Sequence, residues 1–230
     1  MQTLTADSVS KNYGRRQLLN GVFLHCQTGK ITGLLGRNGC GKSTLLKIIY
    51  GTEPAAFKHV RINGMPYNKP YRSGLLHLLS QNYEVPGRLR IATFIRLCCN
   101  IYYQQIAGLS FVAQLAQRRV KDLSGGERRF LFVLAAIYSD ALFVLLDEPF
   151  SHLSPVFANT ITEHMHIMKQ HKGFVVTDHL YRQLIDCSDE LILLHNGSNY
   201  RIRHREDLVT HGYLSSPDQV AGSRLPDSGD

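Results

Sequence analysis

The sequence predicts an α/β fold with a mostly parallel core sheet, a small antiparallel β-subdomain and a helical subdomain. Short apolar runs, such as residues 31–35, 142–146 and 174–177, alternate with segments of helical spacing, as buried parallel strands covered by helices do. Near the start, two strand-like segments follow one another and predict an antiparallel pair. Residues 91–119 have few Gly or Pro and many Ile, Leu, Phe and Tyr, and therefore predict helices.

The first strands are predicted from alternation and from turn chemistry. Residues 3–10 alternate between apolar and polar side chains, and residues 22–27 are expected to be their antiparallel neighbour. Residues 31–35 form a short apolar run, which indicates a buried strand. Residues 60–62 precede the dipeptide at 63–64, Asn-Gly, which is typical of a hairpin turn.

The remaining elements follow in alternation. A helix is predicted from Lys42, where apolar residues recur at helical spacing, and Gly51 suits its end. Further helices are expected from about Ser124, after Pro155 and, as a short one, after His179. Further strands are expected at residues 75–79, 142–146, 174–177 and 190–195.

Composition and periodicity divide the chain into a main domain and a tail. Residues 1–214 are expected to form one domain, with the helical subdomain inserted at about 82–140. Residues 215–230 are rich in Ser, Pro, Gly and Asp and lack periodicity, so we expect them to be disordered.

Composition narrows the classes of protein to which the chain can belong. Hydrophobic residues make up 43% of the 230 residues, enough for a substantial core. No apolar run approaches the roughly 20 residues that cross a bilayer, and the first residues lack the plan of a signal peptide, so a soluble, intracellular chain is expected. Five cysteines, an odd number without metal-like spacing, argue against a disulfide framework and predict small buried hydrophobic side chains.

The net charge of +8 is compatible with nucleic acid, an anionic membrane surface or phosphate ligands. The basic pairs are dispersed and no aromatic residues are interleaved with them. A solvated charged surface is therefore favoured, and no nucleic-acid partner is expected.

A glycine-rich segment has the pattern of a phosphate-binding loop. Residues 36–43 fit G-x-x-x-x-G-K-[ST], after an apolar strand and before an amphipathic helix. Glycines allow a tight turn, and the backbone N–H groups and the helix N-terminus then face an anion. Lys42 is expected to reach the β- and γ-phosphates, and the Ser43 hydroxyl to ligate Mg²⁺. The candidate nucleotide-binding residues are Gly36, Arg37, Asn38, Gly39, Cys40, Gly41, Lys42, Ser43 and the following Thr44.

Two acids follow another apolar run. Asp147 and Glu148 come directly after residues 143–146, which places their carboxylates at the end of a buried parallel strand. Asp147 suits Mg²⁺, directly or through water, and Glu148 suits a general base that polarises the attacking water. Residues 68–71, Asn-Lys-Pro-Tyr, lack the Asp of the Asn-Lys-x-Asp guanine pattern, so ATP is expected rather than GTP.

A third motif, Leu-Ser-Gly-Gly-Glu at residues 123–127, completes a resemblance. With the phosphate loop and the Asp-Glu strand in this order, the chain closely resembles the nucleotide-binding domains of the ATP-binding-cassette (ABC) family over residues 1 to about 212. The resemblance implies a P-loop NTPase fold, ATPase activity, and ATP and Mg²⁺ as cofactors.

The resemblance also implies residue roles. Tyr13 matches the aromatic residue that stacks on adenine, and Gln81 matches the glutamine that senses metal, water and the membrane partner. His179 matches the switch histidine that contacts the γ-phosphate. The implied catalytic residues are thus Glu148, His179 and Gln81, the metal-binding residues Ser43, Gln81 and Asp147, and the signature loop Ser124, Gly125 and Gly126.

The signature opens a predicted helix, so it offers free N–H groups and a second anion-binding end. The resemblance implies that each signature covers the ATP held by a second subunit, with a homodimer expected. In one departure from the family, Ser154 stands where an aspartate that couples the two sites is usual. Ser154 is expected to cap the helix that follows at Pro155.

Three functions are compatible with these features. The first is the ATP-hydrolysing subunit of a transporter, cytoplasmic and attached to the inner face of the membrane through a separate permease subunit. The second is a soluble ABC ATPase that serves a cytosolic assembly such as iron–sulfur cluster biogenesis. The third, a regulatory module without turnover, is disfavoured by the intact Lys42, Asp147, Glu148, Gln81 and His179.

Overall fold

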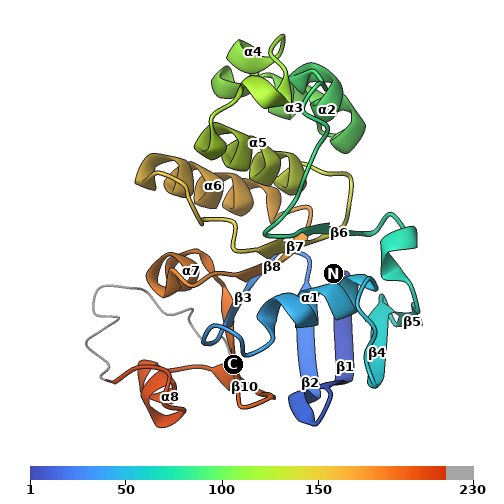
Figure 1. Cartoon of the computed structure of the whole chain (residues 1–230), viewed down its shortest axis with the longest axis vertical. Helices are drawn as coiled ribbons and strands as arrows, with labels where there is room; N and C mark the ends of the chain where they lie inside the picture. Colours follow the sequence, from blue (N-terminus) through green and yellow to red (C-terminus); the bar gives the residue numbers. More distant parts are fainter. Residues whose placement is uncertain (216–230) are drawn as a thin grey trace.

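The computed structural model describes residues 1–215, which form two sheets with helices packed on them (Figure 1). The predicted disordered tail, residues 215–230, lies outside the described residues apart from Ser215. The strands of the larger sheet are β3 (Ile31–Leu35), β6 (Leu76–Leu79), β7 (Phe143–Asp147), β8 (Gly173–Thr177), β9 (Glu190–His195) and β10 (Ser198–Ile202), in the spatial order β10–β9–β3–β8–β7–β6.

The core sheet is mostly parallel, as predicted. β3 pairs in parallel with β8 and β9, and β7 pairs in parallel with β8 and β6. Every residue of β3, β7 and β8 is buried, which explains why these strands are continuous apolar runs rather than alternating ones. Their carboxyl ends lead into the phosphate loop, the Asp-Glu pair and the segment around His179.

The smaller sheet confirms the predicted antiparallel pair near the start. Its strands are β1 (Thr3–Tyr13), β2 (Arg16–Gln27), β4 (Phe57–Ile62) and β5 (Met65–Pro66), in the order β2–β1–β4–β5. Asn63 and Gly64 both have positive φ angles, 53° and 78°, which a type I′ hairpin turn between β4 and β5 requires.

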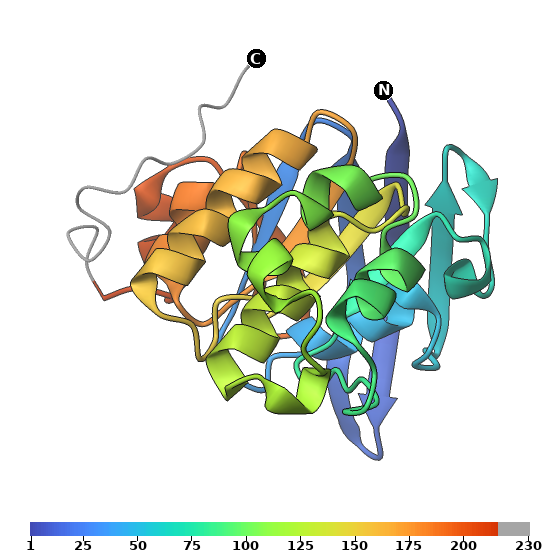
Figure 2. The ribbon, with the colours of Figure 1, turned by 90° about the horizontal axis from the view of Figure 1, so that it is seen from above.

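The helices cover both faces of the core sheet. They are α1 (Lys42–Tyr50), α2 (Ile91–Cys98), α3 (Tyr103–Ala107), α4 (Ser110–Leu115), α5 (Gly125–Ile137), α6 (Pro155–Met168), α7 (Tyr181–Cys187) and α8 (Arg205–Thr210), with short 3₁₀ turns η1 (Pro70–Arg72) and η2 (Val120–Asp122). α5 and α6 lie between the sheet and the outlying α2–α4, and α1 lies on the side of the antiparallel sheet (Figures 1 and 2).

Two hydrophobic clusters follow from this layering. Neighbouring residues of β3 point to opposite faces, so Leu35 belongs to the hydrophobic cluster that includes α5 and α6, while Leu34 belongs to the cluster that includes α1 and the smaller sheet. Both side chains are fully buried, and burial of each contributes roughly 1.5–3 kcal/mol. The sheet therefore holds the loops at its strand ends between two cores.

Some details differ from the prediction. The helical stretch at 91–119 is three short helices, because the chain turns at residues 99–102 and again at 108–109. β10 and α8 were not predicted. Within residues 1–215, no helix is long and apolar enough to cross a membrane. All five cysteines are free thiols, as expected, and three of them are buried.

Candidate functional site

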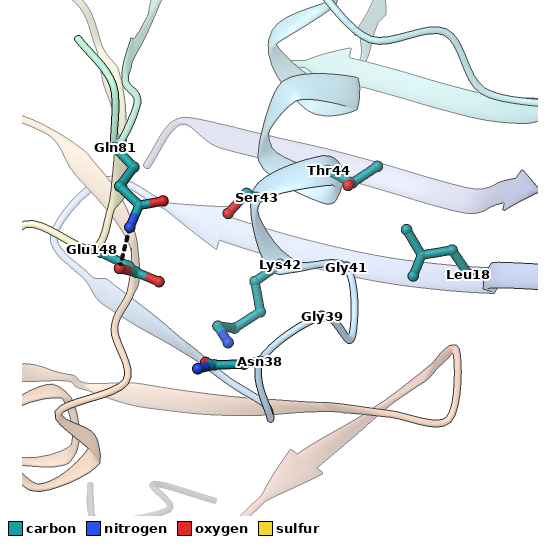
Figure 3. A pocket seen from close by; sticks show the side chains of 9 residues that line it. All are labelled: Leu18, Asn38, Gly39, Gly41, Lys42, Ser43, Thr44, Gln81 and Glu148. Atoms are coloured by element: carbon teal, nitrogen blue, oxygen red, sulfur yellow. Dashed lines mark hydrogen bonds between the residues drawn. The ribbon is translucent and has the colours of Figure 1, made fainter. Parts of the chain in front are cut away.

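The phosphate loop joins β3 to α1 and surrounds a cavity of about 370 Å³ (Figure 3). At Gly41, which precedes α1, φ is 110° and a Cβ atom would lie 2.9 Å from Leu19 Cδ2, so only glycine fits there. Lys42 Nζ donates to the carbonyl oxygens of Gly36, at 2.6 Å, and Arg37, at 3.4 Å. The ammonium group thus lies inside the curve of the loop, where a phosphate would replace these carbonyls as its partner.

The cavity has the size of a small-molecule site. Most of the predicted loop residues line it, together with two residues from distant segments, Gln81 and Glu148. Leu18, from β2, also lines the cavity and was not predicted. The predicted residues that line it are Asn38, Gly39, Gly41, Lys42, Ser43, Thr44, Gln81 and Glu148.

Two predicted loop residues point their side chains elsewhere. Arg37 Nη2 donates to the carbonyl oxygen of Gly212 at 2.8 Å, so its guanidinium ties the loop to the segment after α8. Arg37 and Cys40 line a neighbouring cavity of about 390 Å³ instead, and burial raises the pKa of the Cys40 thiol. Any contact of these two residues with a nucleotide would come from their backbone N–H groups.

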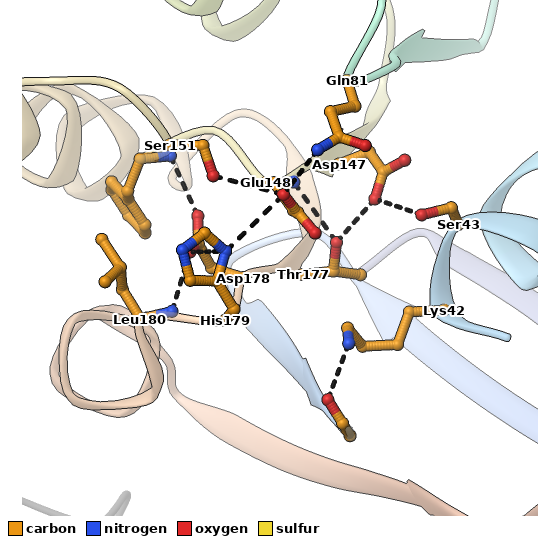
Figure 4. A network of polar contacts seen from close by, with 12 residues as sticks. Lys42, Ser43, Gln81, Asp147, Glu148, Ser151, Thr177, Asp178, His179 and Leu180 are labelled. Carbon is orange, nitrogen blue, oxygen red and sulfur yellow. Dashed lines mark hydrogen bonds and ion pairs between the residues drawn. The ribbon is translucent and has the colours of Figure 1, made fainter. Parts of the chain in front are cut away.

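Asp147 lies at the end of β7, directly opposite the start of α1 (Figure 4). The Ser43 hydroxyl donates to Asp147 Oδ1 at 3.0 Å, and the Thr177 hydroxyl donates to the same oxygen at 2.9 Å. Asp147 is only 3% exposed, so its carboxylate is held by these hydroxyls rather than by water. Hydroxyl and carboxylate oxygens are the ligands that Mg²⁺ prefers, and the residues present therefore fit that ion.

Glu148 follows in a left-handed backbone conformation, with φ of 52°. Its Oε2 accepts hydrogen bonds from Gln81 Nε2 at 2.9 Å and from the Ser151 hydroxyl at 3.3 Å. His179 Nδ1 lies 3.6 Å from the same oxygen. The carboxylate thus meets the predicted glutamine and histidine at the rim of the phosphate cavity (Figure 4).

Asp178 fixes the segment that carries His179. Its carboxylate accepts from the backbone N–H groups of Phe150, at 3.0 Å, and Leu180, at 2.9 Å, and it is fully buried. Burial raises the pKa of Asp178 above its ordinary value, although the two N–H donors oppose the rise. Because Phe150 follows the Asp-Glu pair, Asp178 ties the loop after β7 to the loop after β8.

The signature residues begin α5, as predicted. The Ser124 hydroxyl accepts from the Glu127 N–H at 3.3 Å, and Glu127 Oε2 accepts from the Ser124 N–H at 2.8 Å, which is a capping box. The hydrogen bond from the Ser124 N–H to the carboxylate lowers the pKa of Glu127. Ser124, Gly125 and Gly126 are not among the residues that line the chain's own phosphate cavity.

Tyr13 also lies apart from that cavity. It ends β1, its ring is 52% exposed, and its hydroxyl donates to Glu53 Oε1 at 3.1 Å. Lys11 Nζ lies 4.7 Å from the centroid of the ring. The tyrosine is therefore accessible for stacking without lining the phosphate cavity.

The sequence did not identify Leu18, Thr177, Asp178 and Arg129 as residues of the site. Leu18 lines the cavity directly, Thr177 and Asp178 hold the neighbouring segments by hydrogen bonds, and the Arg129 guanidinium reaches the ends of β6 and β7. Of these, only Thr177 and Asp178 carried a signal, because Thr177 ends the buried strand β8 and Asp178 stands between that strand and His179.

Comparisons with known proteins agree with this geometry. The family model described as ABC transporter matches residues 19–151. An uncharacterized ABC transporter ATP-binding protein of Rhizobium meliloti is 30% identical over 91% of this chain and 83% of its own length. The lipopolysaccharide export system ATP-binding protein LptB of Escherichia coli is 27% identical, over 92% of this chain and 91% of that protein.

A third relative is longer. The spermidine/putrescine import ATP-binding protein PotA of Legionella pneumophila is 29% identical over 82% of this chain, which spans 56% of PotA.

Solved structures share the fold. The ATP-binding subunit of an ABC transporter superposes with a TM-score of 0.76 at 20% identity, covering 94% of this chain and 97% of that one. A bacterial Atm1-family ABC exporter with ATP bound gives 0.77 at 20% identity, covering 97% of this chain and 42% of the exporter. With the family match and the relatives, these likenesses show that the chain belongs to the ABC transporter family, as an ATP-binding subunit with ATPase activity.

Proposed function

We propose that this chain binds ATP with Mg²⁺ in the phosphate cavity and hydrolyses it to drive transport through a separate membrane permease. The observation that carries the proposal is the position of Glu148, whose carboxylate lies at the rim of the phosphate cavity within reach of Gln81 and His179. A carboxylate in that place takes the proton of a water that attacks the γ-phosphorus, while ADP leaves.

The other residues bind and orient. Lys42 exchanges its carbonyl partners for the β- and γ-phosphates, and Gln81 and His179 orient the water and the γ-phosphate. Ser43 and Asp147 would hold Mg²⁺, with Gln81 nearby, and the ion would neutralise phosphate charge. Tyr13 offers its exposed ring to adenine. These roles divide hydrolysis between proton transfer at Glu148 and charge stabilisation at the loop.

The remaining site residues support an assembly of two copies. Ser124, Gly125 and Gly126 form the N-terminus of the 13-residue α5 and do not line the chain's own phosphate cavity. Such a helix end offers N–H groups that lack acceptors within the helix, and a positive dipole end. Two copies arranged head to tail would place each signature on the ATP held by the other, and loss of the γ-phosphate would release them.

The proposed location is the cytoplasmic face of the cell membrane, where the chain attaches through a permease. The relatives compared above are named as transporter, import or export subunits, which favours this reading over service to a cytosolic assembly. Affinity-tagged chain should retain a membrane protein in detergent extract. Recovery of soluble partners alone would contradict the transport proposal.

The ATPase assay tests the chemistry. Glu148→Gln removes the general base but keeps the side chain's size, so the rate should fall about 10²–10⁴-fold. Glu163→Gln, an exposed acid on α6, is the matched control and should retain the wild-type rate. Equal, negligible rates for wild type and Glu148→Gln would instead indicate a regulatory module without turnover.

A further inference from the structure

Arg129 connects the signature helix to three backbone carbonyls of the catalytic segments. It lies in the second turn of α5, five residues after Ser124, and α5 packs over β6 and β7 (Figure 1). Its Nη2 atom donates to the carbonyl oxygens of Asp147, at 2.9 Å, and Glu148, at 2.8 Å. Its Nη1 atom donates to the carbonyl oxygen of Ser80 at 3.3 Å.

The three carbonyl acceptors belong to the backbone segments that position the reacting side chains. Ser80 directly precedes Gln81, and the other two belong to the metal-binding and general-base candidates themselves. One planar guanidinium therefore fixes both ends of the Gln81–Glu148 contact. A lysine, whose three N–H donors all lie on one nitrogen, cannot reproduce the planar fork that reaches several carbonyls at once.

The conformation of Glu148 gives this contact its importance. With φ of 52°, the residue occupies a backbone region that non-glycine residues rarely adopt, and it stays there only when its surroundings hold it. Its N–H donates to the Thr177 carbonyl at 2.8 Å, and its own carbonyl accepts from Arg129 on the other side. Loss of either contact frees the peptide to relax, which would turn the carboxylate away from the cavity.

Burial opposes the positive charge of Arg129 and lowers its pKa, and the nearby carboxylates of Asp147, Asp178 and Glu148 partly offset this lowering. The guanidinium remains charged in proteins, so its donors are always available to the carbonyls. Arg128, the preceding residue of the helix, is exposed.

We propose that Arg129 is a positioning residue, which holds Glu148 and Gln81 in the geometry for hydrolysis and links them to the first turns of the signature helix. The proposal rests on the proposed ATPase function. Since the signature end of α5 is the part that would contact a second copy, a shift of that helix would move the carbonyls of Ser80, Asp147 and Glu148 through this one side chain.

Steady-state ATPase kinetics test the role. Arg129→Met removes the donors but keeps the apolar stem, and we expect kcat to fall about 10–100-fold with KM and the Kd for ATP changed less than about threefold. Arg129→Lys should recover part of kcat, because one donating nitrogen is restored. Arg61→Met, an exposed arginine of β4 far from the site, is the charge control and should behave as wild type.

The outcomes separate positioning from folding. An unchanged kcat in Arg129→Met would overturn the proposal, as would a loss of kcat that matches a loss of folded protein or of ATP binding. If Arg129→Met does not fold, Arg129→Lys decides: a wild-type kcat in a folded lysine variant would overturn it. Failure of the proposed function is distinct, because wild type itself would then have no ATPase activity.

A double-mutant cycle tests whether Arg129 acts through Glu148. In the Glu148→Gln background, Arg129→Met should lower the residual rate by a smaller factor than in the wild-type background, because one of the two groups it positions, the general base, is already absent. A further loss as large as in the wild-type background would mean that Arg129 acts independently of Glu148, and would overturn the proposal.

Discussion

At the scale of single residues, Lys172 carries a buried ammonium group that contacts a carbonyl oxygen and an aromatic ring. It is 1% exposed, it donates to the Ser139 carbonyl, and its Nζ lies 4.7 Å from the ring centroid of Tyr102. Burial lowers the pKa of Lys172 to about 8, and its charge adds to the burial that lowers the pKa of His77 to about 4. Lys172 thereby joins the end of α5 to the outlying helical region.

The lowered pKa of Lys172 predicts a pH dependence of stability. Between pH 8 and 10.5 the unfolded chain holds a proton on this lysine that the folded chain has lost, so the contribution of Lys172 to the free energy of unfolding rises with pH. Below pH 8 the full cost of burying the charge is present. The unfolding free energy of wild type minus that of Lys172→Met should increase by roughly 2–3 kcal/mol across this window.

Chemical denaturation at pH 7.5 and pH 10.5 measures that difference. Buried thiols and tyrosines with raised pKa values act in the opposite direction, but they are common to both proteins and cancel. A difference that stays flat across the window would show that Lys172 is protonated equally in the folded and unfolded chains.

The sequence alone predicted those residues of the site that follow the strands of the core sheet. The motifs around Lys42 and Asp147 were identified from residue patterns that follow buried strands, and His179 was identified from the family resemblance. Parallel strands bring their carboxyl ends, and with them these residues, to one edge of a sheet. Arg129 carried no such signal. Its partners are backbone carbonyls on other elements, and these come within its reach only after α5 packs on β6 and β7.

At the scale of elements, Ser154 and Pro155 determine how α6 begins. The Ser154 hydroxyl accepts from the Phe157 N–H at 3.3 Å, and Pro155 occupies the first helical position, as predicted. Ser154→Ala should therefore lower the free energy of unfolding by about 1 kcal/mol, measured from urea midpoints. Ser154→Asp, which restores an acceptor and suits the helix dipole, should be as stable as wild type. Equal stability of the alanine variant would exclude a capping role.

The strands of the core sheet that were predicted, and the starts of the predicted helices, agree with the structure within a residue or two, whereas β1, β2 and β4 are three to six residues longer than predicted. Elements with weak local signals were missed. α1 begins at Lys42 and is capped by Gly51 in a left-handed conformation, as the sequence indicated. β10 was missed because it is an edge strand with polar residues on most positions, so it shows no apolar alternation. α8 has only six residues and one fully buried side chain, Leu208, which is too little for a periodic pattern.

At the scale of the whole molecule, the phosphate loop and the signature, which are the two segments proposed to contact ATP, lie in different parts of one chain. The phosphate cavity faces β2 and the start of α1, whereas Gly125 lines a separate cavity of about 260 Å³ with Arg129 and Ser151. Gln81 borders both cavities. One copy can thus hold the phosphates of ATP but cannot enclose them with its own signature, which is why we expect two copies in the working unit.

The mass of the ATP-bound, hydrolysis-deficient protein tests this expectation most directly. Light scattering on Glu148→Gln should give the 26.0 kDa monomer without nucleotide and twice that mass with ATP and Mg²⁺. Adding Gly125→Asp, which places negative charge at the signature end of α5, should keep the doubly substituted protein monomeric with ATP. A Glu148→Gln protein that binds ATP and remains at the monomer mass would contradict the head-to-tail clamp.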